Sequence, residues 1–315
     1  MSREKSGPLY TKNIHPPLSV MNQNTGFWQD RKKEWISLGI ESEIGRENIK
    51  TFNTGEWVEN NIESDKDYRM PNISIFDPFL CELAYQWFSP KDGIVLDPFC
   101  GGSVRGIVSS YLDRKYIGID LSERQIEANK EQTDIVSNKE HKPNWIHDDS
   151  LNLDNHVDDN SVDFIFSCPP YHDLEVYTDD DRDLSRMSYD KFMDNYRKII
   201  HKCYSKLKDN RFAGFVITEL RDPKTGGYKN FLLDTIRAFE DAGFVFYNDI
   251  VLIQTTGTKA LVAQKLWDNN RKITRRHQNF LLFIKGDGKK AKQDMSDIER
   301  INLEGSSLEE FYEME

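Results

Sequence analysis

From about residue 73 onward, short apolar runs alternate with polar or glycine-rich turns. Seven of these runs are rich in β-branched and aromatic residues and predict strands, at about 93–97, 115–120, 144–149, 162–166, 212–218, 244–254 and 279–285. Apolar residues spaced three and four apart predict helices over about 26–39, 78–87 and 188–207, with others starting near Val104 and Ser122 and one closed by Gly243. This alternation predicts an α/β fold with a doubly wound, mostly parallel sheet and a C-terminal antiparallel hairpin. The segment between the last two strands has no helical pattern, so we expect a long loop there.

The polar segments at both ends predict appendages to one main domain. Residues 1–70 form an N-terminal helical or irregular appendage, in which helix 26–39 has one aromatic face (Phe27, Trp28, Trp35 and Leu38). We expect that face to dock on the main domain and the charged residues 30–33 to lie largely opposite. The main domain covers 71–286. Residues 287–315 contain 9 acidic and 4 basic residues and predict an acidic, partly disordered tail.

Composition narrows the class of protein. No stretch approaches the roughly 18 apolar residues of a membrane span, and the N-terminus lacks the apolar segment of a secretory signal. The four cysteines form no C-x-x-C pair, and the histidines are scattered without metal-ligand spacing. We therefore expect a cytoplasmic protein with reduced thiols, no structural metal and no membrane segment.

Unusual sequences follow four successive predicted strands. The first strand ends in DPFCGGS (Asp97–Ser103), in which paired glycines let backbone approach a ligand and the next helix offers its N-terminal amides. The second strand ends in Asp120, the usual position of a ribose-binding acid, and the third in Asp148-Asp149-Ser150, placed to bind an adenine amino group. The fourth ends in CPPY, where prolines force the chain out of the sheet and present Tyr171. Alone, each feature also fits a tight turn, a capping acid or a packing tyrosine.

Together these features resemble the amino-directed DNA methyltransferases, which methylate adenine N6 or cytosine N4 from S-adenosylmethionine. DPFCGGS is similar to the family's D-P-F-x-G-S-G motif and CPPY to its (D/N/S)-P-P-Y motif. SIFDPFLCELAYQWF resembles the segment before the first strand that helps to hold the methionine part of the cofactor, and RRHQNFLLFIKGD the last hairpin strand. The resemblance covers about 71–286, which it makes the catalytic domain. Residues 28–46 further resemble the N-terminus of methylase-like proteins from phages and prophages. A phage-type protein with a role in restriction-modification is therefore the expectation.

The resemblance implies a Rossmann-like methyltransferase fold and a role for each matched residue. The residues expected to bind S-adenosylmethionine are Phe76, Asp97, Pro98, Phe99, Cys100, Gly101, Gly102, Ser103, Asp120 and Asp149. The residues expected at the reacting base are Cys168, Pro169, Pro170 and Tyr171. The target base must leave the helical stack, and Tyr171 would pack against it. Because (D/N)-P-P-Y also serves other substrates, an RNA or protein-amide methyltransferase, or a non-catalytic cofactor-binding protein, remains an alternative.

Cys168 departs from the family motif, which has Asp, Asn or Ser at this position. A thiol is a weak hydrogen-bond acceptor, and Ser167 should point the other way along the strand. Backbone carbonyls of Cys168 or Pro169 could replace the missing acceptor, or the thiol could act as a nucleophile for ring-carbon methylation. Two further interpretations remain. The protein could have lost methyl transfer while still binding cofactor and nucleic acid, or Cys168 could be a buried packing residue.

The insert at 255–277 is the best candidate for contact with DNA. Its six basic residues against one acid give a local charge of +5 in a chain of net charge −11. Trp267 lies among them, as expected for phosphate contacts combined with a stacking aromatic. A solvated charged loop is the alternative. The residues concerned are Lys259, Lys265, Trp267, Arg271, Lys272, Arg275 and Arg276.

Overall fold

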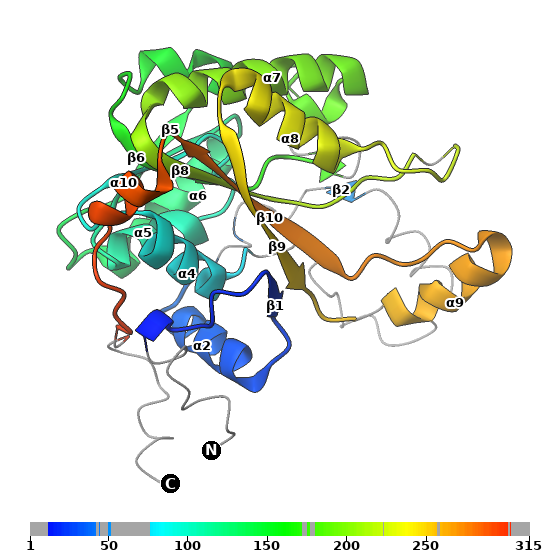
Figure 1. Cartoon of the computed structure of the whole chain (residues 1–315), viewed down its shortest axis with the longest axis horizontal. Coiled ribbons are helices and arrows are strands. Elements are labelled where there is room, and N and C mark those ends of the chain that lie inside the picture. The colour runs from blue at the N-terminus through cyan, green and yellow to red at the C-terminus, as the bar shows by residue number, and fades with distance from the viewer. Residues whose placement is uncertain are drawn as a thin grey trace, which may run out of the picture.

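The computed structural model describes residues 12–41, 44, 50–51, 76–171, 175–176, 180–222, 224–256, 259–301 and 303. An eight-stranded sheet runs through the molecule in the order β1-β9-β10-β8-β6-β3-β4-β5 (Figure 1). Its strands are β1 (Val20–Asn22), β3 (Ile94–Asp97), β4 (Lys115–Asp120), β5 (Asn144–His147), β6 (Val162–Ser167), β8 (Leu207–Ile217), β9 (Val245–Ile253) and β10 (His277–Lys285). A separate antiparallel pair joins β2 (Lys50–Thr51) to β7 (Glu175–Val176).

The sheet is doubly wound. The chain proceeds from β3 outward to β4 and β5, and then returns to β6 on the other side of β3. All of the described pairings in this sheet are parallel except those of β10, which runs antiparallel to β8 and β9. The predicted α/β fold with a mostly parallel sheet and a closing hairpin is therefore confirmed. The reversal of strand order lies between β3 and β6, which is where open α/β sheets bind their ligands.

Two helical layers cover the sheet because its central strands are apolar on both faces. In β6, Phe164 and Phe166 belong to the core beneath α4, α5 and α6, whereas Ile165 faces α7 and α8. The helices are α2 (Gly26–Ile36), α4 (Pro78–Phe88), α5 (Val104–Tyr111), α6 (Glu123–Glu131), α7 (Tyr189–Lys206), α8 (Phe231–Ala242), α9 (Lys259–Asn270) and α10 (Gly288–Gln293). Short 3-10 helices are η2 (Gln132–Val136), η3 (Ser150–Asn155) and η4 (Leu184–Arg186). None of the described helices is long and apolar enough to cross a membrane.

Helix α2 docks on α4 through its aromatic face, as predicted. The indole N–H of Trp28 donates to Asp77 at 3.0 Å, and that of Trp35 donates to Glu82 at 2.7 Å. The expectation that Arg31 faces solvent is wrong. Its guanidinium is 2% exposed and binds both carboxylate oxygens of Glu82, at 2.8 and 2.6 Å. The buried carboxylate of Glu82 requires a charged partner, and Arg31 supplies it. The spacing of apolar residues in the sequence does not predict this ion pair.

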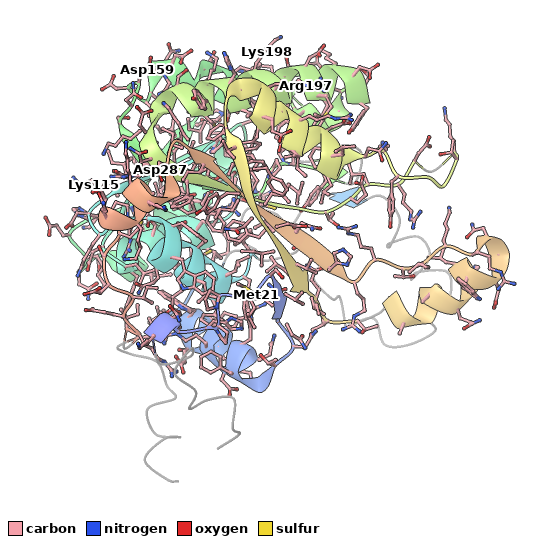
Figure 2. The ribbon with its side chains drawn as sticks, viewed as in Figure 1. Met21, Lys115, Asp159, Arg197, Lys198 and Asp287 are labelled. Carbon is pink, nitrogen blue, oxygen red and sulfur yellow. The ribbon has the colours of Figure 1, made fainter. Side chains whose placement is uncertain are left out.

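The interval between β9 and β10 contains helix α9, so the predicted unstructured loop is wrong there. Its residues have high intrinsic helix propensity, but none of its described side chains is buried. Because the described side chains of α9 form no buried apolar face, the spacing of apolar residues does not predict it. The N-terminal strand β1 was also missed; it is three residues long and pairs with β9 at the sheet edge, where Met21 (labelled in Figure 2) is buried.

Part of the predicted acidic tail also has described structure. Residues 288–293 form α10, and Leu303 is buried in the core cluster that includes Trp28 and Trp35. The expected domain boundaries at 70/71 and 286/287 stay predictions.

Candidate active site

Four loops converge where the parallel strands end. Asp97 ends β3, Asp120 ends β4, Asp149 follows β5, and Cys168 follows β6. Since β3 lies between β4 and β6, the loop after Asp97 is flanked by Asp120 on one side and by Cys168 on the other. The carboxyl edge of the sheet thus brings together the residues that the sequence predicted at successive strand ends.

The side chain of Asp97 lies beneath this site and not in it. It is 0% exposed and accepts four hydrogen bonds, from Phe99 N (3.1 Å), Arg105 Nε (2.5 Å), Tyr116 Oη (2.7 Å) and Ser167 Oγ (2.5 Å). Burial alone lowers the pKa of Arg105, but the adjacent Asp97 carboxylate holds it well above its usual value. Asp97 therefore links β3 to β4 and β6 by hydrogen bonds at the switch point, where the strand order reverses.

The glycine turn (Asp97–Ser103) is held by side chains that donate hydrogen bonds to its backbone carbonyls. Arg105 Nη2 donates to the carbonyls of Phe99 and Cys100, at 2.8 and 2.9 Å. Ser150 Oγ donates to the Pro98 carbonyl, and Asn129 Nδ2 donates to that of Gly101 at 2.6 Å. Gly101 has a φ of +47°, in the left-handed region that favours glycine. Contacts within the protein therefore fix the conformation of the turn.

The residues beyond the glycine turn have the features of an anion site. Ser103 precedes α5, whose first amides have no partners within the helix. The Ser103 hydroxyl is buried and has no hydrogen-bond partner among the described residues. A carboxylate at this helix N-terminus could accept from both the amides and the hydroxyl. Phe76, whose ring lies 4.5 Å from the Arg105 guanidinium, also approaches the turn.

The two predicted acids each bind backbone N–H groups. Asp120 accepts from Gly101 N and from Ser122 N, both at 2.9 Å, so it links the glycine turn to the start of α6. Asp149 accepts from Leu151 N at 2.8 Å and caps η3. A carboxylate has about four lone-pair sites, so both side chains retain capacity to accept from ligand hydroxyl or amino groups.

Cys168 and Tyr171 lie at the end of β6. Ser167 points to Asp97, as the alternation of the strand predicts, so it cannot replace Cys168 as the acceptor at the site. The Cys168 sulfur lies 3.6 Å from the Tyr171 hydroxyl, which also accepts from Gln278 Nε2 at 3.4 Å. The Tyr171 ring meets Phe231 edge-on, with ring centroids 6.5 Å apart. Tyr171 is thus fixed from β10 and α8 while remaining partly exposed.

Sequence reasoning missed several residues that shape this site: Arg105, Tyr116, Asn129 and Gln278. Arg105 could have been found from the sequence, because a basic residue in the first turn of a buried helix requires an acidic partner and Asp97 lies eight positions before it. Gly106 has a packing role, because a Cβ atom there would lie 2.2 Å from the ring of Trp145.

The basic insert divides into two parts. Arg275 donates to the His277 carbonyl and to Asn279, and Arg276 donates to the Gln254 carbonyl, so both brace the ends of β9 and β10. Arg271 lies 5.0 Å from the ring of Trp267, which is 43% exposed. Lys259 begins α9 and Lys265 lies within it. Lys272 lies against Gly226 of a second loop, the hairpin at 221–228. The sequence analysis did not identify this hairpin as part of a site.

The arrangement at the sheet edge is that of a methyltransferase of the Rossmann-like class. The chain belongs to the N6/N4 DNA methylase family, whose family model matches residues 75–131 and 162–312. The methyl donor expected for this family is S-adenosylmethionine, as predicted from the sequence. The likeness of residues 28–46 to phage proteins stays a prediction, since the match begins at residue 75.

Several solved structures are similar to this chain at low identity. TrmN from Thermus thermophilus is 12% identical over 67% of this chain and 49% of its own, with a TM-score of 0.42. A putative sarcosine dimethylglycine methyltransferase from Galdieria sulphuraria is 13% identical over 67% of this chain and 85% of its own, with a TM-score of 0.45. The SAM-bound magnesium protoporphyrin IX methyltransferase of Synechocystis PCC 6803 is 12% identical over 62% of this chain and 71% of its own, with a TM-score of 0.39.

These likenesses are too weak to bear on substrate, and the chain spans about half the length of TrmN. A search of curated proteins finds no match to this chain. Within the described residues, no group of three or more His, Cys, Asp or Glu side chains could hold a metal ion.

Proposed function

We propose that this protein transfers a methyl group from S-adenosylmethionine to the exocyclic amino group of adenine (N6) or cytosine (N4) in DNA. The observation that carries the proposal is the position of CPPY at the end of β6, adjacent to the glycine turn at the end of β3. A methyl donor in the turn and a base against Tyr171 would then meet at the switch point of the sheet. Membership of the DNA methylase family supports DNA as the substrate.

The residues present fit the cofactor in three places. The α5 N-terminus and the buried hydroxyl of Ser103 suit the methionine carboxylate, and the turn from Asp97 to Gly102 suits the methionine chain. Asp120 would accept from the ribose hydroxyls and Asp149 from the adenine amino group. Pro98, Phe99, Cys100 and Phe76 would form the apolar surroundings. When bound, S-adenosylmethionine supplies an electrophilic methyl group on sulfur.

The CPPY segment would orient the nucleophile. An exocyclic amine is weakly nucleophilic because its lone pair is delocalised into the ring. Acceptors that bind its N–H groups localise that lone pair, and alignment with the methyl group supplies much of the rate. Backbone carbonyls of Cys168 and Pro169, with the Cys168 sulfur, are the candidate acceptors. Pro170 stiffens the segment, and Tyr171 provides the surface against which a flipped base packs.

The function is tested by incubating the purified protein with labelled S-adenosylmethionine and DNA, RNA or protein separately. Label in DNA that nucleoside analysis identifies as N6-methyladenine or N4-methylcytosine supports the proposal. Label in RNA or protein alone would establish one of the alternative substrates. Cofactor binding without any transfer, in each substrate, would establish the non-catalytic alternative.

Replacing Asp120 with alanine is expected to lower affinity for S-adenosylhomocysteine by roughly 10-fold to 100-fold, because two or more hydrogen bonds to a charged acceptor are lost. Isothermal calorimetry measures the change. Asp134→Ala is a matched control, since Asp134 lies in η2 away from the strand ends. Equal affinity in the Asp120 variant and the control would remove Asp120 from the cofactor site.

Replacing Cys168 with serine is expected to preserve or raise turnover, because a hydroxyl accepts hydrogen bonds better than a thiol. Cys168→Ala is the matched control that lacks an acceptor, and it should be slower than Cys168→Ser. Rates are compared at saturating cofactor. If instead serine abolishes transfer and a 5-fluoropyrimidine substrate traps a covalent adduct with the wild-type protein, Cys168 is a nucleophile.

A further inference from the structure

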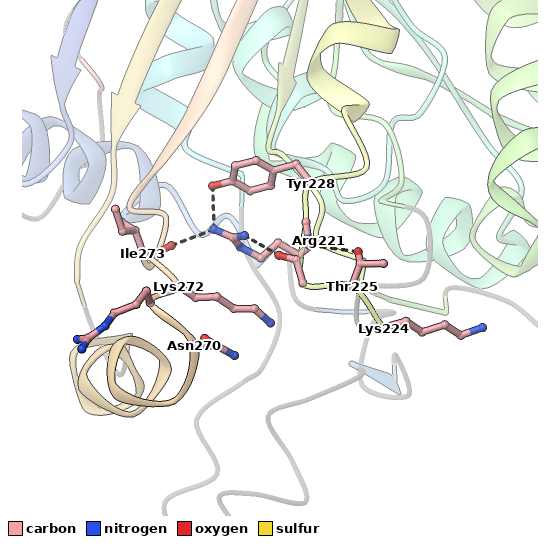
Figure 3. Close-up of a pocket in the computed structure, with 10 residues that line it drawn as sticks. Arg221, Lys224, Thr225, Tyr228, Asn270, Lys272 and Ile273 are labelled. Atoms are coloured by element: carbon pink, nitrogen blue, oxygen red, sulfur yellow. Dashed lines mark hydrogen bonds between the residues drawn. The ribbon is translucent and has the colours of Figure 1, made fainter.

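A basic groove lies beside the candidate active site, between two loops that are far apart in sequence. One wall is the hairpin at 221–228, closed by the bridge between Arg221 and Tyr228. The other wall is the segment 270–273, which begins at the last residue of α9 (Figure 3). The groove has a volume of about 740 Å³ and is lined by Arg221, Lys224, Thr225, Gly226, Gly227, Tyr228, Asn270, Arg271, Lys272 and Ile273.

Arg221 joins the two walls. Its guanidinium donates to the Gly226 carbonyl at 2.8 Å within the hairpin and to the Ile273 carbonyl at 3.3 Å across the groove. It also donates to the Tyr228 hydroxyl at 3.2 Å and lies 4.2 Å from the centre of that ring. Arg221 therefore holds the two walls of the groove together by hydrogen bonds to both of them.

The groove carries strong positive charge. Lys224 and Arg271 are exposed, and Lys272 crosses so close to Gly226 that a Cβ atom there would lie 2.5 Å from its Cε. None of the residues that line the groove is acidic. Asp222 lies in the same hairpin, where its carboxylate accepts from Lys224 N at 2.7 Å; this hydrogen bond lowers the pKa of Asp222. Tyr228 and Ile273 add exposed apolar surface, at 44% and 71%.

The position of the groove relates it to Tyr171. Tyr171 follows the end of β6, the hairpin follows the end of β8, and the segment 270–273 leads into β10. These three strands are consecutive neighbours in the sheet. At roughly 5 Å between strands, the end of β8 and the start of β10 lie about 5 and 10 Å along the edge from the end of β6, and the two walls extend outward from there.

We propose that this groove binds the phosphate backbone of DNA next to the target base, with Lys224, Arg271 and Lys272 as the phosphate contacts. The inference rests on the proposed function and adds the hairpin at 221–228 as half of the nucleic-acid interface. Clustered cations with flanking apolar surface and no acidic lining suit a sugar–phosphate strand. Contact there positions the duplex so that a flipped base reaches Tyr171.

A charge reversal tests the groove. Lys224→Glu combined with Lys272→Glu is expected to weaken binding of a short labelled DNA duplex roughly tenfold or more, and to reduce the salt slope by about 0.9 for each lost contact. Arg197→Glu combined with Lys198→Glu makes the same charge change on α7 (both residues are labelled in Figure 2), outside the residues that line the groove, and should have little effect. Fluorescence anisotropy in the presence of S-adenosylhomocysteine measures the affinity for DNA. Calorimetry verifies that the affinity for S-adenosylhomocysteine is unchanged.

A second pair of variants separates charge from folding. A Cβ atom at Gly227 would meet only the Thr225 hydroxyl, at an ordinary 3.5 Å, so a side chain can begin there without a clash. Gly227→Glu and Gly227→Gln have nearly the same shape and differ by one charge. The glutamate variant should bind DNA several-fold more weakly than the glutamine variant at low salt, with the difference disappearing at high salt.

The outcomes distinguish the groove from the function. If the wild-type protein methylates DNA but the Lys224/Lys272 variant matches its control in affinity and salt slope, the groove proposal fails and the function stands. If the wild-type protein neither binds nor methylates DNA, the function itself fails. Stronger competition by single-stranded RNA than by unlabelled duplex would overturn DNA as the occupant.

Discussion

Replacing Tyr171 with alanine is expected to reduce methyl transfer to DNA about 10-fold to 100-fold, because one base–aromatic stacking contact stabilises by roughly 1–3 kcal/mol. The ring is held edge-on to Phe231, and its hydroxyl accepts from Gln278. Affinity for S-adenosylhomocysteine should remain unchanged, since the glycine turn and Asp120 are tied to other groups. Single-turnover rates and calorimetry measure the two effects.

Tyr171→Phe is the matched control for this experiment. It keeps the stacking surface and loses the hydroxyl, which lies 3.6 Å from Cys168 and 3.4 Å from Gln278. Its transfer rate should therefore lie within a few-fold of the wild-type rate. A Tyr171→Ala variant that turns over as fast as Tyr171→Phe would show that the base packs elsewhere.

Replacing Asp97 with asparagine is expected to lower the free energy of unfolding by about 3–5 kcal/mol, the typical cost of breaking a buried ion pair. Each carboxylate oxygen accepts two hydrogen bonds, one pair from Arg105 and Tyr116 and the other from Phe99 and Ser167. Whichever way the amide turns, its NH₂ group faces two donors, and the buried Arg105 loses its counter-charge. Urea denaturation measures the loss, and cofactor affinity should fall with it because Arg105 also holds the glycine turn.

Asp92→Asn is the control for this substitution. Asp92 is 67% exposed and paired with His141, so its loss should cost less than about 1 kcal/mol. Equal stability of the two variants would mean that Asp97 is not the anchor of the switch point.

Local sequence determined the elements that point to the chemistry. A strand such as Val162–Ser167 has apolar residues on both faces and must be buried, and Pro169-Pro170 must end it. In a parallel sheet the strand ends then meet at one edge, so the motifs at Asp97, Asp120 and Cys168 could be brought together from their order alone. The α/β fold and the closing hairpin followed from this reasoning, whereas the methylase family came from the resemblance of DPFCGGS and CPPY to that family's motifs.

Tertiary structure alone decided which side chains meet across that edge. The burial of Arg31 against Glu82, the hydrogen bonds that Asp97 accepts from Tyr116 and Ser167, and the hydrogen bond from Asn129 to Gly101 all join distant segments. The groove likewise required the hairpin at 221–228 to lie beside 270–273. Periodicity reports only whether a residue faces a core. The partner of a buried polar group is set by strand order and loop packing, which depend on the whole chain.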